Sequence, residues 1–199
     1  MMGQDNRAFI QTAAQDGSSH HLRNPQYLGS QLEFDVDLSH VPCSCQAHVY
    51  LAKVDESSCS WANEQNARVI SPCTSIDLMM ANDSGFKSQF RTCQSWGGGC
   101  ELEAKCQRKA TDGGNAAAFG KGPNYDIDTN NPFHMTYQFW VDEDADGNRG
   151  SLTDIRQVIS QVVNGVSKEV IIDSNCTGVS DLTAVLPNMS LGVANYDVG

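Results

Sequence analysis

The chain has 199 residues, of which 40% are hydrophobic, and a formal net charge of −11. This length and apolar content are enough for one globular domain with its own core, and they exclude a wholly disordered chain. So acidic a surface repels nucleic-acid phosphates and anionic membranes, so we expect no nucleic acid and no membrane as partner. Neutral sugars, cations and basic proteins remain open.

Cysteine is frequent, and we interpret it as a sign of disulfides in an oxidising compartment. No Cys-x-x-Cys pair of the zinc-site type occurs among the eight residues: Cys43, Cys45, Cys59, Cys73, Cys93, Cys100, Cys106 and Cys176. Asn-x-Ser/Thr sequons at Asn82, Asn175 and Asn188 agree with secretion. Residues 1–17 lack the apolar core of a signal peptide. Because the cysteines and sequons indicate secretion, we expect a secreted protein whose signal peptide is not in this chain.

Two regions are expected: a polar leader over residues 1–26 and a β-domain over residues 27–199. Strict alternation of apolar and acidic residues predicts a half-buried strand from Leu32 to Leu38, which Pro42 terminates. The pattern favours further strands over Val49–Val54 and Ser75–Asn82.

The second half of the chain reads as loops followed by strands. Residues 94–124 are rich in Gly and Cys and predict a long loop region, whereas Phe133–Val141 has the aromatic and β-branched content of a strand. Asn164-Gly165 suits a type I′ turn between Val158–Val163 and Val166–Ile172. A helical period also fits four apolar residues of this region, and they are Leu152, Ile155, Ile159 and Val162. We favour the hairpin over this helical alternative. Short strands with no βαβ rhythm predict an all-β sandwich.

Three colinear stretches together resemble the family 7 glycoside hydrolases, the cellobiohydrolases and endoglucanases. Residues 32–39, followed by Val41-Pro42-Cys43, resemble that family's Phe-Asp-Val-Asp-Val-Ser and Leu-Pro-Cys segments. Residues 73–82 resemble its catalytic strand, Cys-Ser-Glu-Met-Asp-Ile-Trp-Glu-Ala-Asn, and residues 122–129 resemble part of a later strand pair. The resemblance implies a concanavalin-like jelly roll whose concave face binds β-1,4-glucan. The matching segments omit parts of the family chain, so we expect an incomplete sandwich.

The resemblance also places the catalytic positions, and two of them have changed. The family's nucleophile position falls on Ser75, the helper aspartate on Asp77 and the acid/base position on Met80. Retaining glycosidases need two carboxyl groups about 5–5.5 Å apart. Serine without a base is a poor nucleophile, and a thioether donates no proton. Only Asp77 is retained, so we expect no intact catalytic site and no family mechanism.

Three functions follow from this pattern. The first is a degenerate relative of the cellulose-degrading glucanases that is catalytically inactive and at most binds β-1,4-glucan. The second is an active β-glucanase with displaced carboxylates, for which Asp77 and Asp83 are the candidates. The third is a non-functional fragment of such an enzyme.

A calcium loop is a separate candidate. Asp142, Asp144 and Asp146 precede Gly147, as at the opening of an EF-hand loop, where alternate oxygen ligands suit a hard cation. The twelfth position is Thr153 rather than a bidentate Glu. An acidic, solvated loop between strands is the competing interpretation, and no other cofactor is expected.

The resemblance also implies a local disulfide between Cys100 and Cys106. It raises a question of stability, because a sandwich that lacks strands leaves sheet edges and apolar faces uncovered. We therefore expect self-association unless residues 1–26 or 181–199 supply the missing strands.

Overall fold

The computed structural model describes residues 6–9, 11–13, 19–21, 26–42, 44–53, 75–91, 106–143, 149–173, 179–184 and 186–197. Within these ranges the chain is all-β apart from two short 3-10 helices, η1 (Val179–Leu182) and η2 (Leu186–Asn188). Among the described residues, no helix is long and apolar enough to cross a membrane.

The larger sheet has six strands and contains the segment that resembles the catalytic strand. All of its neighbouring strands are antiparallel. Across the sheet the order is β1 (Asn6–Phe9), β14 (Met189–Asp197), β5 (Cys45–Lys53), β6 (Ser75–Asn82), β7 (Gly85–Arg91) and β8 (Cys106–Lys109).

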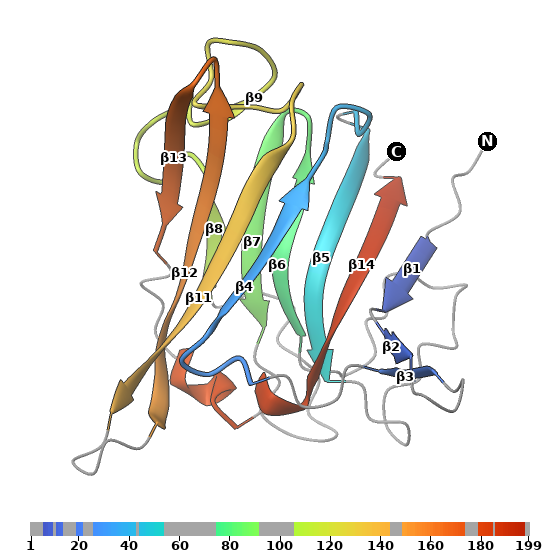
Figure 1. Ribbon diagram of the computed structural model, residues 1–199, viewed down its shortest axis with the longest axis vertical. Helices are drawn as coiled ribbons and strands as arrows, with labels where there is room; N and C mark the ends of the chain where they lie inside the picture. The colour runs from blue at the N-terminus through green and yellow to red at the C-terminus, as the bar shows by residue number, and fades with distance from the viewer. Residues whose placement is uncertain are drawn as a thin grey trace.

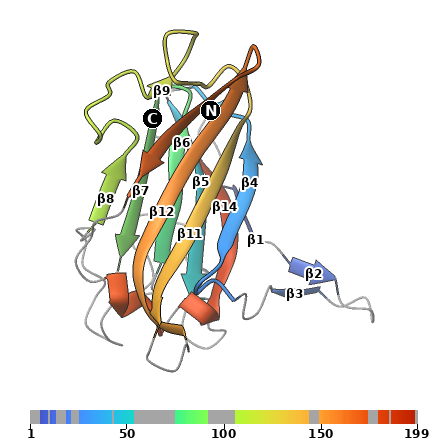
Figure 2. The same cartoon turned by 60° about the vertical axis from the view of Figure 1, so that its left-hand side comes forward.

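The smaller sheet has four antiparallel strands and lies face to face with the central strands of the larger one (Figures 1 and 2). Its order is β13 (Val166–Ile172), β12 (Arg149–Val163), β11 (Phe133–Glu143) and β4 (Gln31–Val36). Two short ribbons flank the sandwich. They are the antiparallel pair β2 (Gln11–Ala13) with β3 (Ser19–His21), and the parallel pair β9 (Phe119–Gly120) with β10 (Ile127–Asp128).

Side-chain alternation on both sheets builds one core between them. Along β11 every second residue from Phe133 to Phe139 is buried, while the intervening ones are only partly covered. Ile76 and Leu78 of β6 meet Tyr137 and Phe139 in a single apolar cluster. Burial of a large apolar side chain contributes about 1.5–3 kcal/mol, so this cluster is what holds the two sheets together.

The strands predicted from alternation and turn chemistry are present. Gln31–Val36 and Ser75–Asn82 are strands, and the second predicted strand begins earlier than expected, at Cys45. The hairpin is confirmed: Asn164 and Gly165 have φ of 53° and 77°, as a type I′ turn requires. The helical alternative is wrong, because β12 runs unbroken through that segment. Leu152, Ile155 and Ile159 are buried by the facing sheet rather than along a helical stripe.

Both ends of the chain contribute strands to the six-stranded sheet. β1 lies within the segment expected to be a leader, and it pairs with β14. β14 in turn pairs along its length with β5, from Met189 opposite Lys53 to Asp197 opposite Cys45. Met189 is fully buried and Leu191 is 9% exposed, so β14 also contributes to the core.

Several sequence-based expectations concern residues outside the described ranges. The proposed Cys100–Cys106 disulfide involves Cys100, which lies there, as do Asp144 and Asp146 of the calcium loop. Cys45 is described, and it is a half-buried free thiol.

Candidate functional site

A β-bulge in β6 sets the geometry of the candidate site. Asp77 pairs with Tyr50 of β5 and Gln89 of β7, whereas Met80 pairs with His48 and Lys87. The chain therefore advances three residues along β6 while each neighbour advances two, and Leu78 has no partner in either register. One extra residue reverses the alternation beyond it. Asp77 and Met80, which a regular strand would place on opposite faces, thus lie on the same face.

Burial agrees with this arrangement. Leu78, Met79 and Ala81 belong to the core cluster between the sheets, and Asp77 and Met80 do not. The site face is therefore the side of the six-stranded sheet that points away from the four-stranded one. Ser75 opens the same strand, paired with Ala52 and Arg91.

Tyr137 supports the bulge from the opposite sheet. Its hydroxyl donates a hydrogen bond of 2.8 Å to the carbonyl oxygen of Leu78, the residue that is left out of the strand registers. The tyrosine is fully buried, and burial raises its pKa well above the usual value, so the phenol stays protonated and remains a donor. A buried carbonyl without a partner is costly, so this bond stabilises the backbone shape that positions Asp77 and Met80.

Asp77 is oriented by a neighbouring amide. The Gln89 side chain donates from Nε2 to Asp77 Oδ2 over 2.7 Å, across the β6–β7 pair. Gln89 is only 5% exposed while Asp77 is half-buried, so a largely buried amide orients the more exposed carboxylate. Hydrogen bonds to a charged acceptor contribute about 1.5–3 kcal/mol, enough to fix one rotamer of the carboxylate.

Aromatic and imidazole side chains of β5 continue the site face beside Asp77. Tyr50, which is 5% exposed, lies over Gly192 of β14, where a Cβ would collide with the phenol ring. His48 Nε2 lies 2.9 Å from Gln46 Oε1, and both side chains are half-buried. The described side chains of β5, β6 and β7 on this face are thus mostly polar: amides, a phenol, an imidazole, one ammonium and one carboxylate, with the thioether of Met80 among them.

Met80 occupies the position that the resemblance gives to the acid/base group. It is 5% exposed and has no ionisable atom. Asp77 is the sole carboxylate among the described side chains of β5, β6 and β7 on this face, the others being Gln46, His48, Tyr50, Met80, Asn82, Lys87 and Gln89.

Asp83, the other candidate carboxylate, lies in the β6–β7 turn and is occupied by structural contacts. Its Oδ2 is 3.3 Å from Lys121 Nζ, and Ser84 Oγ donates to its Oδ1 over 2.6 Å. Its backbone carbonyl accepts a 2.6 Å bond from Thr129. Six residues of strand span roughly 20 Å, so Asp83 is far beyond the separation that a retaining pair requires from Asp77.

The remaining predicted metal ligand that the structure describes is Asp142. Its carboxylate lies over Gly150 across the β11–β12 hairpin, where any Cβ would clash with it. Among the described residues no group of three or more His, Cys, Asp or Glu side chains could hold a metal ion. Asp144 and Asp146 lie outside those residues, so calcium remains a prediction.

Sequence reasoning identified Asp77 and Met80 but did not find Gln89, Tyr50, Gly192 or Tyr137. Each of these acts across a strand pair or between sheets, and a linear pattern does not show which strands become neighbours. The sequence did contain a signal for the bulge, because the family motif that it resembles requires an Asp and a residue three positions later to share one face of the strand.

No protein-family model matches the chain, and no curated protein sequence matches it. Solved structures do match. A family 7 (GH7) cellobiohydrolase from Daphnia pulex is 14% identical with a TM-score of 0.67, over 99% of this chain and 66% of that one. An endocellulase from Humicola insolens is 16% identical with a TM-score of 0.64, over 98% and 65%. A cellobiohydrolase from Melanocarpus albomyces, complexed with cellotetraose, is 16% identical with a TM-score of 0.58, over 98% and 65%.

These likenesses show the fold: an all-β jelly roll of the kind seen in family 7 cellulases. The chain spans 56% of an endoglucanase I complexed with cellobiose, and no more than 66% of the three structures above. The jelly roll predicted from the sequence is confirmed.

Proposed function

We propose that this protein is a secreted, non-hydrolytic relative of the family 7 cellulases that binds β-1,4-glucan on the outer face of β5, β6 and β7. The observation that carries the proposal is the composition of the bulged strand β6. It keeps the geometry that aligns two functional positions on one face, but only Asp77 has a carboxylate while Met80 fills the other position.

Loss of hydrolysis follows from the chemistry of these residues. A glycosidic bond needs a proton on the leaving oxygen, and general acid catalysis contributes about 10²–10⁴ in rate. The Met80 thioether has no proton to give, and Ser75 replaces the nucleophilic carboxylate. Asp77 alone can orient a hydroxyl group but cannot act as nucleophile and acid at once.

Glucan binding is supported by the polar character of the same face. Amide, imidazole, phenol and carboxylate groups are the partners that sugar hydroxyls need, and the Asp77–Gln89 and His48–Gln46 contacts hold these groups in place. Two of the similar structures were solved with cellobiose or cellotetraose bound. A neutral ligand is favoured because a net charge of −11 repels anions.

The decisive experiment is hydrolysis of a chromogenic β-cellobioside by the purified chain. Release of the chromophore should equal that of the blank, and Asp77→Asn should change nothing. Hydrolysis that survives purification and is lost in Asp77→Asn would establish instead an active glucanase with displaced carboxylates. The double reversion Ser75→Glu with Met80→Glu should restore little activity, since the chain spans no more than about two thirds of the similar enzymes.

Binding needs its own measurement. Titration calorimetry with cellotetraose should give saturable binding that Gln89→Ala and Asp77→Asn each weaken. Wild-type binding that both variants leave unchanged would show that this face is not the binding site. A folded chain with no binding at millimolar sugar would favour the non-functional fragment.

A further inference from the structure

A second surface, on the other sheet, has the features of a binding site. A hollow of about 510 Å³ opens on the outer side of the four-stranded sheet, where the turn before β4 meets the end of β11. Its lining residues are Gly29, Ser30, Gln31, Gln138, Phe139, Trp140, Val141 and Thr153. None of them is charged, in a chain whose formal net charge is −11. This hollow lies on the opposite side of the sandwich from Asp77.

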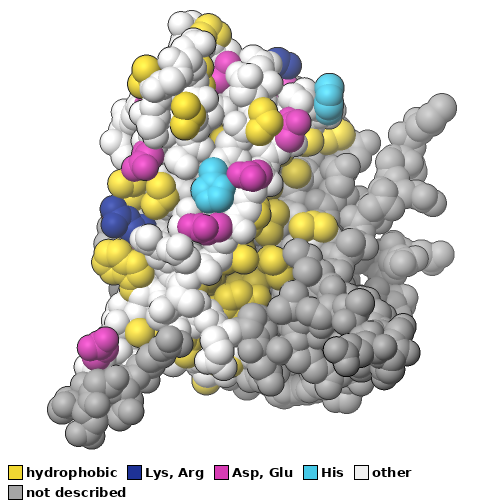
Figure 3. Space-filling view, in the orientation of Figure 1, with side chains coloured by type: hydrophobic (Ala, Val, Ile, Leu, Met, Phe, Trp, Pro, Cys, Tyr) yellow, Lys and Arg dark blue, Asp and Glu magenta, His cyan; other side chains and the backbone are white. Residues whose placement is uncertain are grey.

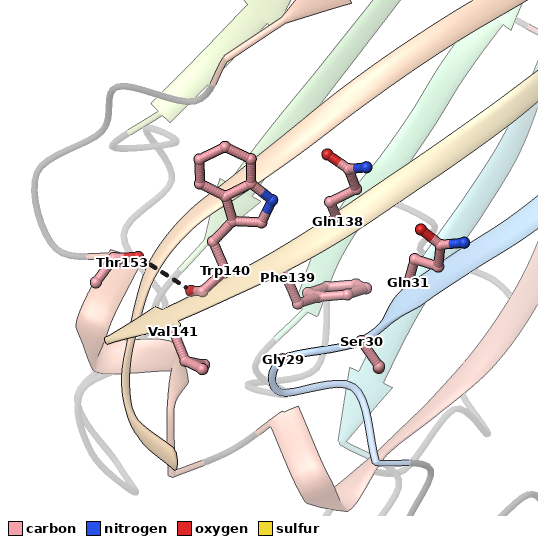
Figure 4. A pocket seen from close by; sticks show the side chains of 8 residues that line it. All are labelled: Gly29, Ser30, Gln31, Gln138, Phe139, Trp140, Val141 and Thr153. Atoms are coloured by element: carbon pink, nitrogen blue, oxygen red, sulfur yellow. Dashed lines mark hydrogen bonds between the residues drawn. The ribbon is translucent and has the colours of Figure 1, made fainter. Parts of the chain in front are cut away.

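Trp140 is the prominent side chain of this hollow. Its exposed fraction is 48%, and Trp140 and Gln138 occupy alternate positions on β11 (Figure 4). Figure 4 shows the Trp140, Gln138 and Gln31 side chains standing on the same side of the sheet, with Phe139 directed the other way. Gln31 and Gln138 are direct cross-strand partners.

The indole is held in position by an arginine of the neighbouring strand. The Arg156 guanidinium lies 5.6 Å from the indole ring centroid. Arg156 is on β12, which neighbours β11 on one side, and β4 neighbours β11 on the other. Arg156 Nε is in turn 3.2 Å from Asp173 Oδ1. A cation over the ring restrains the rotamer of Trp140, so the indole is preorganised.

The floor of the hollow is rigid as well. The turn at residues 26–30 is joined to β11 by two backbone bonds, from Gly29 N to Phe139 O (2.9 Å) and from Phe139 N to Ser30 O (3.0 Å). Tyr27 beneath it is buried and packs its ring 5.4 Å from that of Phe139. A ligand would therefore meet a surface that needs little ordering on binding.

The hydrogen-bonding groups at the rim are neutral. Gln138 makes no side-chain hydrogen bond to any other described residue, and Gln31 uses only its Nε2, in a bond to Glu33 of 3.0 Å. Two amides beside one exposed aromatic face offer both donors and acceptors within two neighbouring strands, which lie about 5 Å apart. Figure 3 shows a few acidic, basic and histidine side chains on this face within a mostly uncharged surface.

We propose that this hollow is a binding site for a neutral oligosaccharide, separate from the face that contains Asp77. A pyranose ring has an apolar face of C–H groups with partial positive charge, which suits the electron-rich face of an indole, and its equatorial hydroxyls suit amide partners. Trp140 stacks on one sugar ring, while Gln138 and Gln31 bind hydroxyls of the same or the next unit. The absence of lining charge selects against charged ligands.

The test is a titration of the full chain with cellotetraose, laminaritetraose and mannotetraose. Binding is measured by calorimetry and by the chemical-shift changes of the indole N–H. At least one of these sugars should bind, and Trp140→Ala should weaken that binding about tenfold or more, as truncation of a central aromatic anchor does. Gln138→Ala should weaken it less. Trp140→Phe, which keeps a ring, should retain part of the affinity and the melting temperature.

Two controls separate this site from the one proposed above. Val162→Ala alters an exposed side chain near the β12–β13 turn and should leave binding unchanged. Asp77→Asn should leave the Trp140-dependent binding intact. Binding that Trp140→Ala does not alter, no binding of any of the three sugars, or a Trp140-dependent dimer without sugar binding would each overturn the proposal. If sugar binding depends on Trp140 but not on Asp77, only the function proposed above is overturned.

Discussion

At the scale of single residues, the contact that most directly shapes the candidate site is between Tyr137 and Leu78. A β-bulge leaves one carbonyl outside the strand ladder, and the phenol of the opposite sheet satisfies it at 2.8 Å. The position of Asp77 relative to Met80 therefore depends on a residue that lies in neither the site strand nor its neighbours.

Tyr137→Phe tests this dependence. Because the variant leaves the buried Leu78 carbonyl without its donor, the free energy of unfolding should fall by about 1–3 kcal/mol in urea denaturation. Tyr125→Phe, at a half-buried tyrosine, should change it by less than about 0.5 kcal/mol. Equal stabilities for the two variants would mean that the bond to Leu78 does not support the bulge.

At the scale of elements, β12 joins the sandwich through two buried glutamines with different roles. Gln161 ties the strand to the segment that enters β11. Its Oε1 accepts from Asp128 N at 2.8 Å, and its Nε2 donates to the carbonyls of Asp128, Asn131 and Pro132 at 2.9–3.1 Å. Gln157 instead donates to Ser88 Oγ of β7 at 2.8 Å, and its Oε1 has no partner among the described residues.

The two glutamines form a matched pair for mutation. Gln161→Leu should destabilise the protein by about 3 kcal/mol or more, because the buried N–H and carbonyl of Asp128 and the part-buried carbonyls of Asn131 and Pro132 lose this side-chain partner. Gln157→Leu should cost about 1 kcal/mol or less, since it removes an unsatisfied oxygen together with one bond. Thermal melts of both variants measure the two losses of stability. A larger loss for Gln157→Leu than for Gln161→Leu would contradict these different roles of the two glutamines.

At the scale of the whole molecule, β1 and β14 both add strands to the six-stranded sheet. β14 fills the position between β1 and β5 and buries Met189. We expect the full chain to melt cooperatively without binding a hydrophobic dye. A chain ending at residue 188, which lacks β14, should bind the dye in its resting state. Dye binding by the full chain itself would show that the sandwich is open.

Alkaline pH offers a second test of the whole fold. Burial raises the pKa of Tyr27 from 10.0 to about 12. Its folded pKa lies above its unfolded value, so the stability linked to its protonated phenol is complete below pH 10 and is lost as the pH rises toward about 12. The free energy of unfolding of the wild-type protein should fall over that window, and that of the Tyr27→Phe variant should fall less steeply. Parallel curves for the two proteins would rule out this linkage.

The sequence by itself determined the local parts of this protein. Alternation from Leu32 to Val36 and in Phe133–Val141 depends on one buried face per strand, and Asn164-Gly165 encodes its turn through its own backbone preferences. These signals lie within a few residues of one another, so a linear pattern contains them. The fold class and the strand that bears Asp77 and Met80 followed from such signals.

Only the tertiary structure decided which distant segments meet. The insertion of β14 beside β5, the Gln89 amide on Asp77, the Tyr137 hydroxyl on Leu78 and the hollow beside Trp140 all join residues from different strands. Strand order is set by the total apolar area that the two sheets bury and by satisfaction of backbone groups across them. Both quantities belong to the assembled sandwich, and no single segment of sequence contains them.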